Sequence, residues 1–178
     1  LEMLRTGEID CAIMAEPFPD TGLAVAPLYD EPFMAAVPSN HPLAARDSIT
    51  SQDLKQETML LLGAGHCFRD HVLEVCPEFA RFSSNAEGMG VTLVPRLGVP
   101  KRALRDLKAP AKARRKLVDD DTDETFVRYL PIVDGQNAAP PSRRVVLAWR
   151  RSFTRYEAIA ALRNAIYACE LPGVNRIT

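Results

Sequence analysis

The stretch GHCFRDHVLEVC, residues 65–76, holds two cysteines nine positions apart. The first of them, Cys67, follows a glycine turn and stands close to His66, Arg69 and Asp70. The thiolate is the reactive form of cysteine, so a thiol beside cationic side chains can act as a nucleophile, a metal ligand or a redox centre. The spacing allows four interpretations: a metal site, a structural disulfide, a pair of buried thiols, or a redox switch.

A zinc site is the weakest of these interpretations. The stretch contains four possible ligands, which are His66, Cys67, His71 and Cys76. No C-x-x-C pair accompanies them, and their spacing matches no common zinc pattern. We therefore predict no metal at this site, and the sequence indicates no cofactor.

A permanent disulfide conflicts with the local pattern of apolar residues. Residues 67–76 have helical spacing, with Phe68, Val72 and Val75 on one face and Pro77 ending the helix. In a helix, nine positions separate the two cysteine backbones by ~13 Å along the axis and turn the side chains to opposite faces. A disulfide requires Cα atoms within ~7 Å of each other. Either the segment is not helical, or it has two states.

The two thiols are expected to differ in reactivity. Cys67 lies at the start of the predicted helix, where unpaired N–H groups and the helix dipole favour an anion. Arg69 and His66 favour the thiolate further, and Asp70 can orient a cation or cap the turn. Cys76 has apolar neighbours and should be less acidic. This asymmetry suits a peroxide-reactive thiol and a resolving thiol that captures its sulfenic acid as a disulfide. The opposing interpretation is an inert core thiol at Cys67.

The rest of the composition is that of an ordinary globular chain. It has 178 residues, of which 47% are apolar, and a formal net charge of -1. That charge argues against a general basic surface for nucleic acid. No apolar run approaches the ~20 residues of a membrane span, so we expect a cytoplasmic protein with no membrane partner. In that compartment a thiol pair is more often catalytic, sensing or metal-binding than structural. The other cysteines, Cys11 and Cys169, are expected to be small buried hydrophobes.

Strands and helices are expected to alternate along the chain. We predict strands at six short apolar runs: 9–15 (buried and parallel), 24–28 and 32–37 on either side of a turn at YDEP, 58–62, 90–95 and 145–149. We predict helices at four places: one ending at Gly7, one beginning at Thr50 or Ser51, one over 67–76, and one over 153–169. The last helix should turn Ile159, Leu162 and Ile166 inward. Residues 39–47 are expected to form a polar loop. The alternation indicates an α/β fold with mostly parallel sheets.

A charged run at 101–124 is basic first and acidic afterwards. Its charges nearly cancel, and no aromatic residues are interleaved for stacking on bases. We interpret the run as a solvated surface insertion rather than a nucleic-acid site at 112–116.

In order, GEIDCAI, PLYDEP, HPLA, GVTLVP, RRVVLAWR and FTRYEAIAALRNAI resemble the LysR-type transcription regulators over nearly the whole chain. GEIDCAI and HPLA are family-wide patterns of moderate specificity. GHC-x-RD followed by a second cysteine is specific to the hydrogen-peroxide sensors of that family.

The resemblance implies an α/β regulatory domain with two Rossmann-like lobes, similar to periplasmic binding proteins. Subdomain I is expected at 1–30 and 146–178, and subdomain II at 31–145, with the redox switch over 63–95. On this pattern Cys67 reacts with peroxide and Cys76 resolves the product. The residues around the thiolate are then His66, Arg69, Asp70 and one arginine of the Arg143–Arg144 pair, of which Arg144 is favoured.

The resemblance also implies a bacterial transcription activator that is not an enzyme. It would respond to hydrogen peroxide, associate as a homodimer or homotetramer, and be reset by a thiol reductant such as glutaredoxin or thioredoxin. Two alternatives remain. One is a LysR-type regulatory domain that binds a small organic effector and has an inert Cys67. The other is a thiol peroxidase, which is disfavoured because LLGAGH lacks the Pro and Thr usual upstream of the reactive cysteine.

Three features depart from the family pattern. The winged helix-turn-helix that would bind promoter DNA is absent from this chain. The first strand-helix-strand unit of the regulatory domain, with the threonines that help hold peroxide, is also expected to be missing. SSNAEGMGVTLVP lacks a helix expected after the second cysteine, which suggests missing residues near 83–89, and the insertion at 101–124 is longer than the family typically carries.

Overall fold

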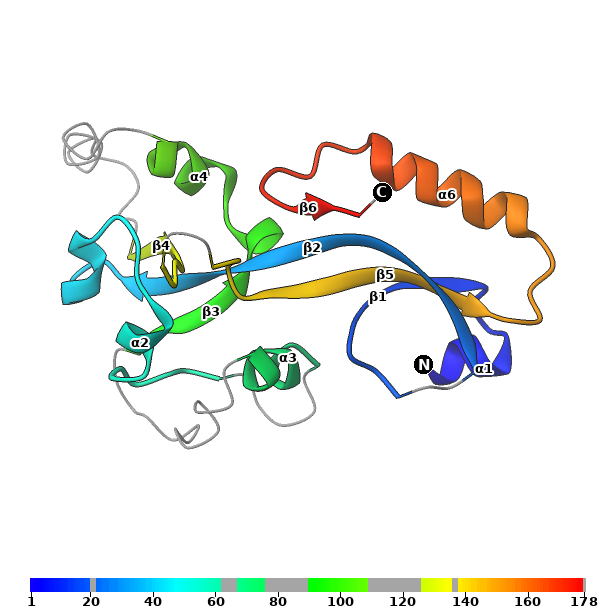
Figure 1. Cartoon of the computed structure of the whole chain (residues 1–178), viewed down its shortest axis with the longest axis horizontal. Coiled ribbons are helices and arrows are strands. Elements are labelled where there is room, and N and C mark those ends of the chain that lie inside the picture. The colour runs from blue at the N-terminus through cyan, green and yellow to red at the C-terminus, as the bar shows by residue number, and fades with distance from the viewer. Residues whose placement is uncertain (20–21, 62–66, 76–89, 109–125, 136–137, 178) are drawn as a thin grey trace. The chain divides into compact units, whose positions relative to one another are not determined.

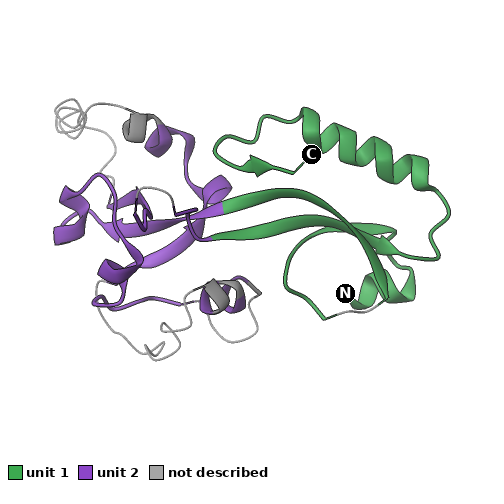
Figure 2. Cartoon of the chain, viewed as in Figure 1, with its two compact units in different colours: residues 1–31, 142–178 green, residues 32–141 purple. Residues whose placement is uncertain are grey.

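The computed structural model describes residues 1–19, 22–61, 67–75, 90–108, 126–135 and 138–177 (Figure 1). The chain divides into two units, which we call unit 1 (Leu1–Glu31 with Ser142–Thr178) and unit 2 (Pro32–Pro141) (Figure 2). The chain passes from unit 1 to unit 2 within one strand, and re-enters unit 1 at the start of another. Identifying these units with the two regulatory subdomains is part of the function proposed below.

Unit 1 is a sheet covered by one long helix. Its elements are α1 (Glu2–Thr6), β1 (Cys11–Ala15), the first part of β2 (Leu23–Pro38), β5 (Ser142–Arg150), α6 (Tyr156–Ala168) and β6 (Asn175–Arg176). Strand β5 lies between β1 and β2. Ile159 of α6 is buried against Leu28, Val145 and Leu147 of these strands, which fixes the helix on the sheet.

Unit 2 is built around the second part of β2. Its other elements are η1 (Pro42–Ala45), α2 (Ser51–Leu54), α3 (Cys67–Val75), β3 (Thr92–Pro95), η3 (Arg96–Gly98), α4 (Lys101–Lys108) and β4 (Val127–Pro131). Ala35 of β2 lies opposite Leu93 of β3 and Leu130 of β4, so β2 is the central strand. The core of unit 2 contains Phe33 of β2 and Val72 of α3.

Several predictions from local pattern are confirmed. The first helix ends at Gly7, whose φ of 86° is the left-handed conformation that glycine adopts easily. Thr50 caps α2, with its hydroxyl accepting from the Asp53 N–H and the Asp53 carboxylate accepting from the Thr50 N–H. Helix α3 and strand β3 also lie where the sequence places them.

The turn predicted at YDEP is wrong. Residues 24–28 and 32–37 belong to one continuous strand, β2, of 16 residues. Asp30 and Glu31 look like turn residues in the sequence, but in the fold Arg144 and Arg143 of β5 pair with them. Because both carboxylates have a cationic partner, the strand continues through them.

The prediction of mostly parallel sheets is also wrong for the described residues, although the α/β class is confirmed. The pairs β1–β5, β2–β3, β2–β4 and β2–β6 are all antiparallel. Two isolated bridges in the described part of the chain, Ile49–Ile132 and Met59–Val91, are parallel. The second bridge replaces the strand predicted over 58–62. Strand β1 is not buried either, since Ile13 is 55% exposed.

Three smaller predictions fail because the sequence pattern does not show which faces are covered. The loop predicted over 39–47 contains η1, which begins at Pro42 and buries Leu43. Leu162 is exposed, because α6 contacts the sheet through a narrower stripe that includes Ile166. Cys169 is exposed as well, whereas Cys11 is half-buried against the sheet core.

Within the charged run, residues 101–108 form α4, and residues 112–116 lie outside the described residues.

Asp53 makes the stability of α2 depend on pH. The Thr50 N–H and hydroxyl both donate to its carboxylate at 2.8 Å, and Arg46 donates to the other oxygen at 2.8 Å. These bonds, above all the one from the Thr50 backbone, hold the pKa of Asp53 below its ordinary value. A lowered folded pKa means that the stabilisation is complete above the unfolded pKa of about 3.9 and disappears as the pH falls through the folded pKa.

Asp53→Ala is therefore expected to lower the free energy of unfolding by about 1 kcal/mol near neutral pH, and by progressively less in acid. Denaturant titrations of both proteins across this pH range measure the difference. Arg46→Ala should keep most of the pH dependence, because Thr50 supplies the largest effect. A deficit in Asp53→Ala that stays constant down to about pH 2 would contradict this explanation.

Candidate functional site

Helix α3 begins at the first of the two cysteines. It spans Cys67–Val75, so the backbone of Cys67 occupies the first helical position. The residues His66 and Cys76 and the side chain of Cys67 lie outside the described structure. The helix places Cys67 at the positive end of the dipole of a nine-residue helix, as the sequence predicts. The pairing of Cys67 with Cys76 stays a prediction.

Two predicted site residues lie on the same first turn as Cys67. Arg69 is half-buried and Asp70 is exposed. The role of Arg69 beside the Cys67 thiolate stays a prediction. Asp70 lies in the first turn, where a carboxylate also interacts favourably with the helix N-terminus. The structure thus places Cys67, Arg69 and Asp70 on one short segment.

One face of α3 enters the core of unit 2. The ring of Phe68 meets the ring of Phe33 edge-on, with centroids 5.5 Å apart and an interplanar angle of 78°. Val72 is only 2% exposed, and Leu73 packs against the same core. The predicted inward positions of Phe68 and Val72 are therefore confirmed, and the helix is anchored to strand β2.

The chain before α3 is tied to the chain after the second cysteine. The Leu60 N–H donates to Val91 O at 2.8 Å, and the Val91 N–H donates to Thr58 O at 2.9 Å. The Thr92 hydroxyl donates to Leu60 O at 2.7 Å. Gly90 fits here because it has no side chain: a Cβ would lie 2.6 Å from Leu60 Cγ and 2.9 Å from Thr58 O. Both ends of the cysteine segment are thus fixed to each other at the sheet.

The arginine pair on β5 is bound to two acidic residues of β2. Arg144 donates to Asp30 through Nε and Nη2, at 2.9 and 3.1 Å, and this carboxylate raises the pKa of the Arg144 guanidinium. Arg143 donates to one oxygen of Glu31 at 2.9 and 2.8 Å. The Glu31 side chain is 2% exposed, so this second pair is buried. The role of Arg144 beside the thiolate stays a prediction.

The Glu31–Arg143 pair was not predicted from the sequence. The signal available was two consecutive acidic residues inside an otherwise apolar stretch, LAVAPLYDEPFMAAV, together with two consecutive arginines in another strand. Buried charges are almost always paired, so such doublets can indicate partners on adjacent strands.

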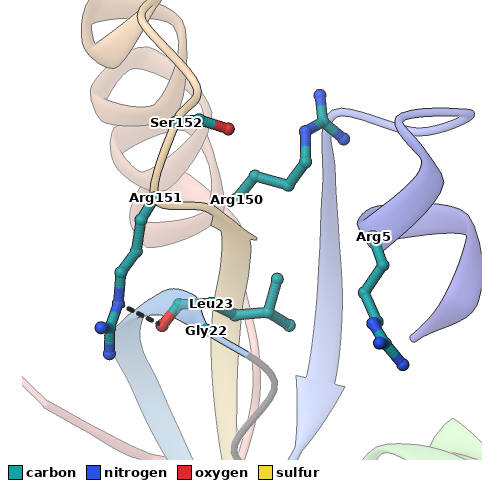
Figure 3. Close-up of a pocket in the computed structure, with 6 residues that line it drawn as sticks. All are labelled: Arg5, Gly22, Leu23, Arg150, Arg151 and Ser152. Carbon is teal, nitrogen blue, oxygen red and sulfur yellow. Dashed lines mark hydrogen bonds between the residues drawn. The ribbon is translucent and has the colours of Figure 1, made fainter.

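A cavity of about 380 Å³ in unit 1 is lined by three arginines but is not built to hold an anion. Figure 3 shows the guanidinium groups of Arg5, Arg150 and Arg151 pointing in different directions. Arg150 donates to Leu4 O at 2.8 Å and to Ile9 O at 2.6 Å, and Arg151 donates to a backbone carbonyl. The Arg150 contacts hold the turn between α1 and β1, so its role is structural.

The described part of the chain contains neither a metal-binding cluster nor a membrane-spanning helix. There, no three His, Cys, Asp or Glu side chains gather closely enough to hold a metal ion. No described helix is both long and apolar enough to cross a membrane.

Comparison with known proteins gives consistent results. The LysR substrate binding domain model matches residues 1–168. The chain is 38% identical over 136 residues to a probable hydrogen peroxide-inducible genes activator of Mycobacterium avium, covering 65% of this chain and 44% of the relative. It thus spans less than half the length of that relative.

Solved structures agree with the family match. The reduced form of OxyR from N. meningitidis is similar with a TM-score of 0.72 and 32% identity, covering 99% of this chain and 80% of that one. The reduced OxyR regulatory domain from Pseudomonas aeruginosa is similar with a TM-score of 0.64 and 34% identity, covering 94% and 77%. These likenesses extend over both units of the chain.

Proposed function

Because the chain belongs to the LysR substrate-binding domain family, we propose that it is the peroxide-sensing regulatory part of a bacterial transcription regulator. The observation that carries the proposal is that Cys67 is the first residue of α3. The names of the relatives support it, because they are hydrogen peroxide-inducible activators and OxyR regulatory domains. Units 1 and 2 then correspond to regulatory subdomains I and II.

Peroxide reacts at Cys67 in this proposal. The Cys67 thiolate attacks one oxygen of hydrogen peroxide, the O–O bond breaks, and the departing hydroxide takes up a proton to become water. Cys67 is then a sulfenic acid. The thiolate is stabilised by the start of α3 and by His66, Arg69 and Arg144, with Asp70 orienting the cationic groups.

Cys76 completes the oxidation. Its thiolate attacks the sulfur of the Cys67 sulfenic acid, the S–O bond breaks, and hydroxide leaves and takes up a proton as a second water. Two thiols have then given two electrons to one peroxide, and the product is a Cys67–Cys76 disulfide. A dithiol such as thioredoxin, or a glutaredoxin with its thiol, restores both cysteines by thiol–disulfide exchange.

The signal arises because the disulfide and α3 exclude one another. Nine helical positions separate the two backbones by ~13 Å, whereas a disulfide needs Cα atoms within ~7 Å. Oxidation therefore unwinds at least part of α3. The change alters how subunits of a homodimer or homotetramer pack, and so moves DNA-binding domains carried elsewhere in a longer cytoplasmic protein. The chain consumes peroxide stoichiometrically and acts as a sensor, not an enzyme.

Peptide mass mapping after addition of one equivalent of hydrogen peroxide tests this function. We expect the chain to lose two hydrogens, with the peptides of Cys67 and Cys76 linked. With excess thiol reductant, sustained peroxide consumption would instead indicate a thiol peroxidase. If Cys67 remains unmodified at micromolar peroxide, the chain is not a peroxide sensor.

A further inference from the structure

Helix α3 is anchored to unit 2, because one face of the helix is part of the core of that unit. The ring of Phe68 meets the ring of Phe33 edge-on, with their centroids 5.5 Å apart. Val72 is only 2% exposed and belongs to the buried cluster that includes Phe33 and Leu93. These contacts require the helical spacing of positions 68 and 72, which places both side chains on one face. They exist only while α3 is a helix.

Resting on the proposed function, we propose that Phe68 and Val72 set the reduction potential of the Cys67–Cys76 pair. Both side chains stabilise the helical, reduced state. Closing the disulfide must unwind the helix between the cysteines and withdraw these side chains from the core. Withdrawing Phe68 and Val72 from the core costs free energy, and this cost opposes oxidation. It therefore determines how oxidising the surroundings must be before the disulfide persists.

The sheet beneath the helix remains the same in both states. Phe33 lies on β2, which pairs with β3 and β4 over four and five residues. The hydrogen bonds that join Leu60 and Thr58 to Val91 fix the two ends of the cysteine segment at this sheet. Rearrangement is thereby confined to the segment between these ends, and a core side chain elsewhere on β2 keeps its contacts. Val37, which is fully buried on β2, is such a side chain.

The sign of the effect follows from which state loses contacts. Val72→Ala removes buried methyl groups from the reduced state alone, so the ratio of disulfide to dithiol at equilibrium increases. A deletion of this size is expected to raise that ratio about tenfold, which corresponds to a potential about 30 mV more negative. Phe68→Ala should shift the ratio in the same direction and by more. Val37→Ala removes the same methyl groups from both states and should leave the ratio unchanged.

The test equilibrates the full chain in glutathione buffers of known potential, then counts free thiols by alkylation and mass spectrometry. Wild type, Val72→Ala, Phe68→Ala and Val37→Ala are compared, and denaturant unfolding of the reduced proteins confirms that each one folds. A more negative potential in both α3 variants with no shift in Val37→Ala supports the proposal.

Three outcomes would overturn it. If Val72→Ala is destabilised but keeps the wild-type potential, the packing of α3 is only structural. An equal shift in Val37→Ala would show that overall stability, not α3, controls the potential. Both results leave the sensor function intact. If wild type forms no Cys67–Cys76 disulfide in any buffer, the sensor function and this inference fail together.

Discussion

Cys67→Ser is expected to abolish the reaction with hydrogen peroxide, whereas Cys76→Ser should stop the reaction at a sulfenic acid on Cys67. A serine hydroxyl is not oxidised by peroxide, so no sulfenic acid forms and Cys76 has no partner. Without Cys76 the sulfenic acid has no resolving thiol and can be captured by dimedone. Intact-mass and peptide spectra of both variants after one equivalent of peroxide measure the difference.

Cys169 provides the matched control for exposure. It is exposed, as a reactive thiol must be, but it follows the C-terminus of α6 and its Sγ–H donates to Ala165 O at 3.3 Å. Cys169 stands at the negative end of a helix dipole, whereas Cys67 stands at a positive end. Cys169→Ser and Cys11→Ser should therefore form the disulfide as wild type does. Faster oxidation of Cys169 than of Cys67 would show that exposure, not helix position, selects the reactive thiol.

Arg143→Ala is expected to destabilise the fold by about 3–5 kcal/mol, because it leaves the buried carboxylate of Glu31 without its cationic partner. Arg143 provides two hydrogen bonds to a side chain that is 2% exposed. A typical domain has only about 5–15 kcal/mol of stability, so this loss is large. Denaturant unfolding of the reduced chain measures it.

The neighbouring arginine provides the control for this prediction. Arg144 also makes two hydrogen bonds, one to each carboxylate oxygen of Asp30, but its side chain is 50% exposed and water can solvate the carboxylate that remains. Arg144→Ala should therefore unfold almost as wild type does. Adding Glu31→Gln to Arg143→Ala should recover much of the loss, since a neutral amide then replaces the buried carboxylate. Equal effects of Arg143→Ala and Arg144→Ala would mean that burial does not decide the strength of these pairs.

The candidate site was predictable from the sequence where its features are local. The helix start at Cys67 was predicted from the glycines that precede it in the sequence and from the spacing of Phe68 and Val72. The cap at Thr50 depends on a residue three positions away. Such features depend on neighbours a few residues apart, which is the range over which side-chain pattern and backbone geometry are coupled.

The features that the sequence did not reveal depend on distant partners. YDEP has the composition of a turn, yet it continues β2 because Arg143 and Arg144, more than a hundred residues later, neutralise Asp30 and Glu31. Strand β1 is antiparallel because its partner is β5, a strand far away in the sequence. Leu162 and Cys169 are exposed because no distant segment of the described chain covers them.

The helix that begins at Cys67 and the family could both be read from the sequence, because each is encoded in adjacent residues or in the order of motifs. The tertiary structure alone decided that Phe68 of this helix lies against Phe33 and that Glu31 lies beneath Arg143. The physical reason is that burial depends on contacts between segments far apart in the chain, and a local pattern shows only which face is apolar, not what covers it.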